Sequence, residues 1–434
     1  MGALQKVAGA MLLAVSATLL APAAWAQTPQ PAPTPLEATG KPVDWVFLFK
    51  LNAGVFPSDP KAERPCPFGG TAQAYTSSFS QDYIWADSAQ HELQQGTGLV
   101  GTGGDPLGAT FAQVYAGGYH YVVWNDQFYR HPNIAGCGDS CASPWGHSKG
   151  LLAWNEHGEG LVLQVTTPSW PASGSASHPR QGDGNTLGCG KNNNVKFSQH
   201  FFSLKLSEPD VENVLDAIAN ASVVTNVNDA QLVNNGGPQG IQERVAKLGR
   251  KSASVSVLKF TLSSGVQLIS KPSALAVPPW QLVSAELGGV DLRAATWWTV
   301  PAIPSTLSTT PIGCWDPGLI KPGAVQIATT GRWPITGSVA GKVIALGAGP
   351  AANGNHAKIG VSTSGTVPFT IFGDMNQQGA LSGKCSSSQN GRGGLFFVIS
   401  DAALHDSVGA LIAGESAPLT LPVKAKAPKK AVKP

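Results

Sequence analysis

The sequence of 434 residues predicts an α/β protein with two lobes related by a pseudo-twofold axis, in which mixed β-sheets are flanked by helices. Apolar runs rich in β-branched and aromatic residues alternate with a few amphipathic stretches, as in layered strands and helices. Glycine (51 residues) and proline (33) are abundant and only 13% of residues are charged, which favours a loop-rich chain over a helical bundle. One short motif also occurs once in each half.

The chain opens with a segment typical of a secretory signal. Lys6 precedes an apolar run that ends in an A-x-A site at Ala26, so cleavage is expected before Gln27. We expect residues 1–26 to be a signal peptide and the protein to be secreted or periplasmic. A membrane anchor is the weaker interpretation, because no later segment is long and apolar enough to span a bilayer. Residues 27–40 form a Pro-rich linker.

The body is expected to consist of an N-terminal half (41–206) and a C-terminal half (207–415). A lysine-rich, low-complexity tail (416–434) is expected to be disordered, and a solvated tail is favoured over one that contacts nucleic acid or an anionic surface. The formal charge of +3 depends on Lys6 and the five lysines of that tail, and without them the charge is about −3. The body is therefore unlike a typical nucleic-acid-binding domain, which is basic overall.

Six cysteines in an exported chain favour three disulfides. Cys137 and Cys141 could close a local loop, whereas spacing alone leaves the other pairings open. A zinc site is the competing interpretation, but no C-x-x-C pair or His/Cys cluster supports it. The six are Cys66, Cys137, Cys141, Cys189, Cys314 and Cys385.

The clearest helix is expected over residues 207–222, with Ser207 as its cap and Pro209 in its first turn. A second helix is expected over 401–414, capped by Ser400. Apolar runs predict strands at 43–52, 119–127, 150–154, 160–167, 254–262, 289–300 and 394–400.

The stretch "PWGHSKGLLAWN" places His147 and Lys149 two residues apart at the head of a strand-like run. In a strand, residues i and i+2 face the same side, so the imidazole and the ammonium form a cationic pair that suits a phosphate. Taken alone, an exposed edge strand with two solvated side chains is the simpler interpretation.

The same pattern recurs about half the chain later. In "HAKIGVSTSGTVPFTIFGDMN", His356 and Lys358 also precede a short strand, a glycine-containing turn and a second apolar strand. Two half-chains, each with H-x-K followed by a hairpin, predict a pseudo-twofold site to which each half contributes one pair.

These four side chains suit the hydrolysis of a phosphodiester. The lysines would neutralise the non-bridging oxygens, one neutral imidazole would attack phosphorus, and the other would protonate the leaving oxygen. We expect no metal and no cofactor, because this scheme requires neither and the sequence shows no convincing cluster of metal ligands. The rate should depend on pH in a bell shape.

At these residues the sequence resembles the deoxyribonuclease II family, whose fold is similar to that of the phospholipase D superfamily. The resemblance rests on "KPVDWVFLFKLN", "WNDQ", "GHSKGLLAWN", "TTPSWP", "GNTLGCG", "FSQHFF", "AATWW" and "WDPGLI", and most specifically on "HAK" followed by "FGDMN" and "GRGG". It spans roughly residues 41 to 400 and is weakest around 223 to 290.

The resemblance implies a metal-independent endonuclease that cuts DNA in acid through a phosphohistidine and leaves 3′-phosphate ends. Its two motifs fall on His147, Lys149, His356 and Lys358, and Asn376 falls where the superfamily has a polar group beside the second pair. Asp374, Asn155 and Arg392 are expected to bind substrate. Asn155 stands where the family usually has an acidic residue, and the cysteine that the family has within "FTIFGDMN" is missing.

Several residues have a simpler interpretation. Asp374 and Asn376 are also good turn formers, and Arg392 could lie exposed in its glycine-rich loop. Solvated side chains are the default for Lys50 and Lys271, with contact to the DNA backbone as the alternative. Trp297, Trp298 and Trp315 could stack on bases, although core packing is the more common role. His200 is expected to be a core or edge residue.

Two other functions remain open: a phosphodiesterase of the same fold that acts on lipids or nucleotides, and a catalytically silent polyanion-binding protein. The two paired histidines favour an enzyme, because a binding protein needs lysines only. The sequence leaves the oligomeric state open, a homodimer included.

Overall fold

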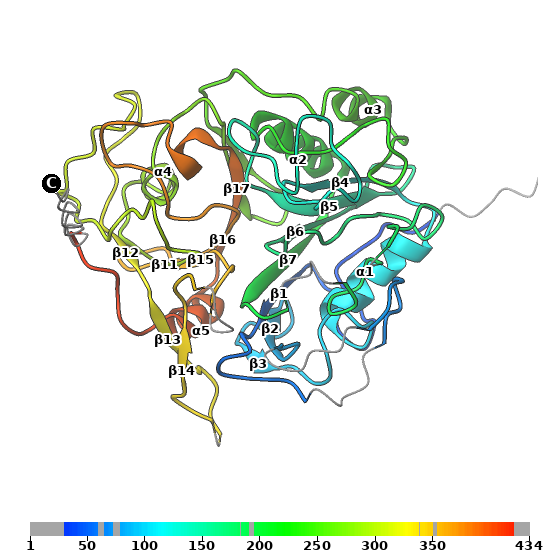
Figure 1. The fold of residues 1–434 in the computed structure, drawn as a ribbon, viewed down its shortest axis with the longest axis horizontal. Helices are drawn as coiled ribbons and strands as arrows, with labels where there is room; N and C mark the ends of the chain where they lie inside the picture. The colour runs from blue at the N-terminus through cyan, green and yellow to red at the C-terminus, as the bar shows by residue number, and fades with distance from the viewer. Residues whose placement is uncertain are drawn as a thin grey trace, which may run out of the picture. The chain divides into compact units, whose positions relative to one another are not determined.

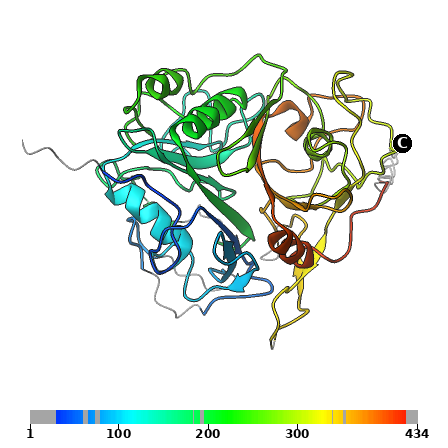
Figure 2. The ribbon, with the colours of Figure 1, turned by 180° about the vertical axis from the view of Figure 1, so that it is seen from behind.

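Two large β-sheets dominate this computed structural model, which describes residues 30–59, 65–72, 79–182, 184–190, 195–337, 339–349 and 354–420. The expected signal peptide and the tail beyond residue 420 lie outside the described residues. From Pro31 onward the chain forms one unit. Figures 1 and 2 show its first sheet in blue to green and its second in yellow-green to orange. The expected α/β class is confirmed.

The first sheet has eight strands in the order β3-β2-β1-β7-β6-β5-β4-β8, and all neighbours are antiparallel. Its central strands are buried throughout, which explains their continuous apolar sequences. The strands are β1 (Trp45–Lys50), β2 (Tyr83–Asp87), β3 (Gln94–Gln95), β4 (His120–Asn125), β5 (Lys149–Trp154), β6 (Gly160–Val165), β7 (Gln199–Leu206) and β8 (Val233–Asn234). The short β8 comes from beyond residue 206, so the first sheet extends past the expected boundary between the halves.

The second sheet has the order β12-β11-β15-β16-β17-β10-β9, and only β11 and β12 pair in parallel. Its strands are β9 (Leu258–Thr261), β10 (Gln267–Lys271), β11 (Leu292–Ala295), β12 (Val325–Ile327), β15 (Ile359–Ser362), β16 (Phe369–Gly373) and β17 (Gly394–Ser400). A separate hairpin joins β13 (Thr330–Arg332) to β14 (Val343–Ala345).

Six neighbouring strands repeat between the sheets. The run β4-β5-β6-β7-β1-β2 in the first corresponds to β11-β15-β16-β17-β10-β9 in the second, with antiparallel pairing at every step. The two H-x-K motifs precede or begin the equivalent strands β5 and β15. The repeat is imperfect at one edge, because β2 follows β1 in the chain whereas β9 precedes β10.

The helices join the strands and cover the sheets. They are α1 (Pro106–Ala116), α2 (Glu208–Asn220), α3 (Gln239–Val245), α4 (Pro279–Glu286) and α5 (Ala402–Leu411), with a 3-10 turn η1 (Ser388–Gly391). The expected helix at 207–222 is α2, and Ser207 and Asp210 form a capping box at its start. The cap of α5 is Asp401, which accepts a hydrogen bond from the Leu404 amide at 2.8 Å, and not the expected Ser400. Asp401 directly precedes the first helical residue, Ala402, so its carboxylate reaches the amide of the third helical residue, whereas Ser400 still belongs to β17.

The two sheets meet through phenylalanine rings. Phe372 of β16 stacks on Phe47 of β1 at 4.5 Å and on Phe202 of β7 at 4.7 Å between ring centroids. Phe202 also lies 5.5 Å from Phe397, its equivalent on β17. This apolar contact holds the heads of β5 and β15 in a common region.

Disulfides and hydrogen bonds tie the connecting segments to the sheets. The six cysteines form Cys66–Cys189, Cys137–Cys141 and Cys314–Cys385, so three disulfides, including the local one, are confirmed. Part of the Pro-rich linker is anchored on α1, because the Thr34 amide donates to Gln113 Oε1 and the Leu36 amide to Thr110 Oγ1.

Candidate active site

His147 lies between the two sheets. Its backbone amide donates to the Gly393 carbonyl at 2.7 Å, and its ring Nδ1 lies 2.8 Å from the carbonyl oxygen of Asp374. Since a carbonyl only accepts hydrogen bonds, Nδ1 carries the ring proton and Nε2 keeps a free lone pair. Burial, and next the charge of Lys149, hold the pKa of His147 well below its usual value, so the ring is neutral.

Lys149 pairs with an aspartate that sequence reasoning did not single out. Its Nζ donates to Asp126 Oδ1, and Arg392 Nη2 donates to Asp126 Oδ2 at 2.8 Å. Asp126 is only 1% exposed. Although burial opposes ionisation, the positive charges of Lys149 and Arg392 hold the pKa of Asp126 well below its usual value. One buried carboxylate thus holds two cations beside His147.

His356 is surrounded by rings at the head of β15. It stacks on Phe197 at 4.9 Å and meets the edge of Trp297 at 4.4 Å between centroids. Its amide donates to the Ser198 carbonyl at 2.7 Å. Trp297 therefore packs against the second motif itself, and stacking on a base stays a prediction.

A glutamine lies against the ring of His356. Gln199 Nε2 is 3.3 Å from His356 Nδ1, and Thr166 Oγ1 donates to Gln199 Oε1 at 2.8 Å. The threonine thereby orients the amide so that its NH₂ faces the histidine. His356 then accepts at Nδ1 and carries its proton at Nε2, which is the opposite tautomer to that of His147.

Lys358 is buried beside the same ring. Its Nζ donates to the His356 carbonyl at 2.5 Å, and its backbone amide donates to His200 Nδ1 at 3.1 Å. Burial, and next the charge of Lys149, hold the pKa of Lys358 well below its usual value. His200 is a fully buried core residue, as expected, and its ring helps to position the second motif.

The two motifs act on one another electrostatically. Burial lowers the pKa of His356 most, followed by the charge of Lys358 from the same half and that of Lys149 from the other half. Groups from both halves therefore lie close enough to oppose one another's protonation.

Asp374 links the halves through both of its oxygen-bearing groups. Its carbonyl holds His147, while its carboxylate accepts from Gln164 Nε2 at 3.0 Å and from the Leu395 amide at 2.9 Å. Burial raises the pKa of Asp374 to about 7, against these hydrogen bonds. Asp374 is thus placed to orient the first histidine.

Asn376 lies two residues further on and is 6% exposed. Its Nδ2 donates to Gln378 Oε1 at 2.9 Å, whereas its Oδ1 is buried and has no partner among the described residues. An unsatisfied buried amide oxygen is costly, so a hydrogen-bond donor on a bound molecule would stabilise it.

Two expected substrate-binding residues are engaged elsewhere. Asn155 lies in the turn between β5 and β6, at the far end of β5 from Lys149, and its Oδ1 accepts from the amides of His157 and Glu159. The structure does not bring Asn155 to the other site residues. Arg392 is close, but it donates to Asp126 and to three backbone carbonyls of the loop that precedes His147.

Both expectations for Lys50 and Lys271 are wrong, because neither is solvated or exposed to a substrate. Each is fully buried at the end of an equivalent strand, β1 or β10. Lys50 Nζ donates to three backbone carbonyls and Lys271 Nζ to four. Burial lowers the pKa of each to about 7. The two amino groups tie together loops next to the two motifs.

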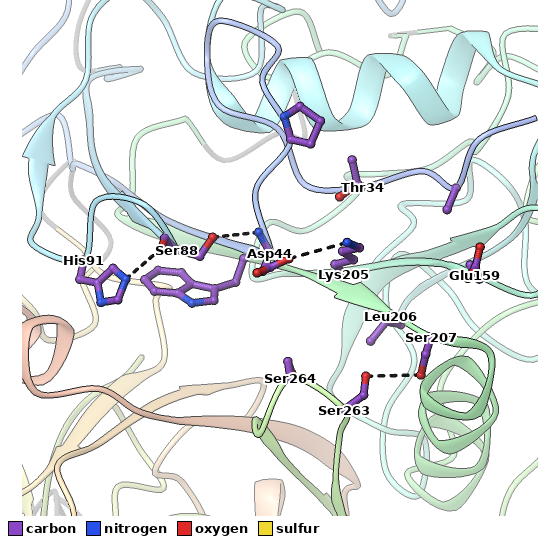
Figure 3. A pocket seen from close by; sticks show the side chains of 13 residues that line it. Thr34, Asp44, Ser88, His91, Glu159, Lys205, Leu206, Ser207, Ser263 and Ser264 are labelled. Carbon is purple, nitrogen blue, oxygen red and sulfur yellow. Dashed lines mark hydrogen bonds and ion pairs between the residues drawn. The ribbon is translucent and has the colours of Figure 1, made fainter.

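A cavity of about 800 Å³ lies elsewhere, at the start of α2 (Figure 3). Its polar groups largely satisfy one another: Lys205 pairs with Asp44 at 3.8 Å, and Ser263 Oγ donates to Ser207 Oγ at 3.4 Å. None of the H-x-K residues lines this cavity.

Among the described residues there is no cluster of three or more His, Cys, Asp or Glu side chains placed to hold a metal ion. In the same part of the chain no helix has the length and apolar character needed to cross a membrane.

Comparison with known proteins bears directly on this site. The family model "Deoxyribonuclease II" matches residues 34–415, which include both H-x-K motifs. The chain belongs to the deoxyribonuclease II family. The protein named Deoxyribonuclease-2-beta of Rattus norvegicus is 28% identical over 137 residues, which cover 30% of this chain and 32% of the rat protein.

The site residues that the sequence did not predict differ in whether a sequence signal could have identified them. Asp126 belongs to the "WNDQ" stretch that carries part of the family likeness, so a buried acidic partner for Lys149 could have been sought there. Thr166 and Gln199 belong to "TTPSWP" and "FSQHFF", which also carry part of the family likeness, but nothing in the sequence shows that the two side chains meet. Their roles depend on the antiparallel neighbours β6 and β7, which place them side by side.

Proposed function

We propose that this protein is a secreted endonuclease that hydrolyses DNA phosphodiester bonds without a metal, through a phosphohistidine, and leaves 3′-phosphate ends. The observation that supports the proposal best is the pair of opposite ring tautomers at the two motifs. His147 presents a free lone pair at Nε2, and His356 presents an N–H at Nε2. Attack on phosphorus needs the lone pair that His147 keeps at Nε2, and the proton that His356 would give to the leaving oxygen, once its ring is an imidazolium, is the one at Nε2.

In the first step His147 Nε2 forms a bond to phosphorus and the P–O5′ bond breaks. The phosphate stays on the 3′-oxygen and becomes linked to the histidine. The Asp374 carbonyl accepts a hydrogen bond from Nδ1–H throughout, so the developing positive charge on the imidazole is stabilised. We therefore propose His147 as the nucleophile, a choice that the sequence left open.

His356 in its imidazolium form donates a proton to the leaving 5′-oxygen. In the second step the now neutral His356 accepts a proton from water, the water oxygen attacks phosphorus, and the P–N bond to His147 breaks. The products are a 3′-phosphate, a 5′-hydroxyl and the starting enzyme.

Lys149 and Lys358 would neutralise the non-bridging oxygens. The pKa of Lys358 lies well below its usual value in the free protein, but an arriving phosphate anion favours the ammonium form. The remaining N–H of the Asn376 amide would donate to the same phosphate, while its free Oδ1, which only accepts, would hold a donor such as the attacking water.

Acidic working conditions fit these pKa directions. The general acid must be protonated, and since the pKa of His356 is lowered, its protonated fraction grows only as pH falls below the usual histidine range. Export fits the three disulfides, which form in oxidising compartments.

The direct test is plasmid cleavage from about pH 4 to about pH 8 in excess chelator, with analysis of the new ends. His147→Ala and His356→Ala should each lower DNA cleavage by about 10³-fold or more, because the two act as a unit. His157→Ala, at the exposed β5–β6 turn, is the matched control and should be silent.

A substrate with a good leaving group separates the two roles. Bis(p-nitrophenyl) phosphate needs little proton donation, so His356→Ala should keep a measurable first step on it while His147→Ala loses it. Inhibition by chelator, or 5′-phosphate ends, would contradict the mechanism. Turnover of small diesters without any DNA cleavage would favour the other phosphodiesterase function.

A further inference from the structure

A second positively charged surface lies at the end of α2. A hollow of about 570 Å³ is lined there by Lys247, Arg250 and Lys251, and Asp216 also lines it. We name this surface the basic hollow. The three cationic side chains are exposed, and Leu258 and Phe260 form part of its wall.

The positive charge of the basic hollow is not neutralised by the protein. Arg244 already pairs with Asp216, with Nε 3.2 Å from Oδ1, and its Nη1 lies 3.0 Å from Glu212. Lys247, Arg250 and Lys251 form no ion pair with any residue that the structure describes. These three cations lie within five residues of one another in the chain. The rest of the protein is not basic, because the net charge without Lys6 and the five lysines of the tail is about −3.

The basic hollow is connected to the loop that carries His147. Lys251 Nζ lies 5.3 Å from the centroid of the Trp145 ring, two residues before His147. Ser222 joins the same two segments, because its Oγ accepts from the Ser252 amide at 2.9 Å and its carbonyl accepts from the Gly146 amide at 2.8 Å. The cations are therefore held at the edge of the first motif.

We propose that the basic hollow binds backbone phosphates of the DNA strand that flanks the bond being cut. This inference rests on the proposed function and names how its substrate is held. Successive phosphates of one strand are about 3.4 Å apart along the helix axis, so cations beside the loop that carries His147 would face phosphates a few nucleotides from the scissile one. Lysine and arginine bind such phosphates without reading sequence. The hollow favours a long polyanion over a small diester.

The experiment compares two triple variants with the same change in charge. Lys247→Gln, Arg250→Gln and Lys251→Gln remove the cations of the basic hollow. Lys41→Gln, Lys205→Gln and Lys321→Gln remove three exposed lysines elsewhere. Binding of a fluorescent DNA duplex is measured by anisotropy at several salt concentrations in chelator, in a His147→Ala background so that the DNA stays intact. Cleavage of DNA and of bis(p-nitrophenyl) phosphate is measured with His147 present.

The hollow variant should bind the duplex roughly 10- to 50-fold more weakly at low salt, with a salt slope smaller by about 2 to 3, as expected for three lost phosphate contacts. Its activity on the small diester should be unchanged, and the control variant should bind DNA like the parent. Equal binding by the two triple variants would overturn the proposal. So would loss of small-diester activity in the hollow variant, since the cations would then support the active site itself.

The binding assay does not depend on turnover. A parent protein that binds DNA through the hollow but never cuts it would contradict the proposed nuclease function and support the inference. If the parent and the hollow variant cut DNA equally well, the result would support the proposed nuclease function and contradict the inference about the basic hollow.

Discussion

At the scale of single residues, Asp126 decides the electrostatics of the first motif. It lies between Lys149 and Arg392 and is almost fully buried, so removing its charge leaves two cations without their counter-ion. The unscreened charge of Lys149 then lowers the pKa of His147 and of Lys358 further, because it already lowers both in the parent protein.

We therefore expect Asp126→Asn to lower the free energy of unfolding by about 3 to 5 kcal/mol, the usual cost of breaking a buried ion pair. Turnover of bis(p-nitrophenyl) phosphate should fall by about 100-fold, since Lys149 loses its position. Urea denaturation and steady-state kinetics measure the two effects. Asp139→Asn is the control, because the Arg130–Asp139 pair is mostly exposed, at 67% and 65%, and should contribute at most about 1 kcal/mol. Equal stabilities of the two variants would contradict this role.

Gln199 is expected to set the pKa of His356. Its amide faces Nδ1 of the neutral ring, and a second proton on that ring requires the amide to turn so that Oε1 accepts it. Thr166 can follow, because its hydroxyl also lies 3.2 Å from the His200 carbonyl. Protonation of the general acid is thus linked to the orientation of one amide.

Gln199→Glu should move the alkaline limb of the pH–rate profile upward by about 1 to 2 pH units. The sign follows because a carboxylate beside the imidazole favours its protonated form, and the reaction requires that form. The limb reports loss of the proton from His356, so a raised pKa extends activity to higher pH. Gln95→Glu places the same charge on the exposed edge strand β3 and should leave the profile in place. An unshifted limb in Gln199→Glu would exclude His356 as the proton donor.

At the scale of elements, the equivalent strands explain why two short motifs meet. β5 and β15 are each the third strand from the corresponding end of their sheets, and each is followed by its hairpin partner, β6 or β16. The equivalent strands β1 and β10 both end in a buried lysine held by carbonyls. Val195 and Arg392, which supply two of those carbonyls, lie in the loops beside His356 and His147. The repeat therefore organises the surroundings of the site as well as its four main side chains.

The end of α2 is the other decisive element. The Gly146 and Gly393 backbones lie so close to the Ala221 carbonyl that a Cβ on either would come within 2.6 Å or 2.1 Å of it. Only glycine fits such an approach. The loops before His147 and after Arg392 are thereby held against one helix end, which also carries the basic hollow.

At the scale of the whole molecule, the disulfides should differ in what they contribute. Cys66–Cys189 spans 123 residues and Cys137–Cys141 spans 4. Chain entropy predicts a loss of about 5 kcal/mol for Cys66→Ser with Cys189→Ser and about 2 kcal/mol for Cys137→Ser with Cys141→Ser. Guanidinium denaturation of the two double variants measures this order.

The loss of activity should rank the two double variants in the opposite order to the loss of stability. The Cys141 carbonyl accepts from Arg392 at 2.8 Å, so opening the short loop loosens a partner of Asp126. Hydrolysis of bis(p-nitrophenyl) phosphate by the short-loop variant should therefore fall more than by the long-loop variant, when both are assayed well below their denaturation midpoints. Unchanged activity of the short-loop variant would show that the Cys137–Cys141 loop does not help to position the active site.

Local signals in the sequence predicted much of this arrangement. The α2 helix, its Ser207 cap, the β5–β6 hairpin and the strands β1, β4 and β17 all follow from periodicity, capping residues and turn residues that lie close together in the chain. The recurrence of H-x-K predicted a site shared by two halves. These features depend on near neighbours, or on chemistry that a few residue types carry by themselves.

Other features depended on distant neighbours and could not be inferred. Asn155 was expected at the site because it stands where the family usually has an acidic residue, but six residues of extended strand carry it to the far end of β5. Lys50 and Lys271 look like surface residues until the sheets bury them.

By itself, then, the sequence determined the α/β class, the disulfide-rich exported character expected of the chain, and the four side chains of the two motifs. Only the tertiary structure decided which partners each of them has: a carbonyl for His147, an amide for His356 and a shared carboxylate for Lys149. The physical reason is that the tautomer of a histidine and the charge of a buried lysine depend on groups within a few ångströms, and packing between two sheets, rather than chain order, brings those groups together.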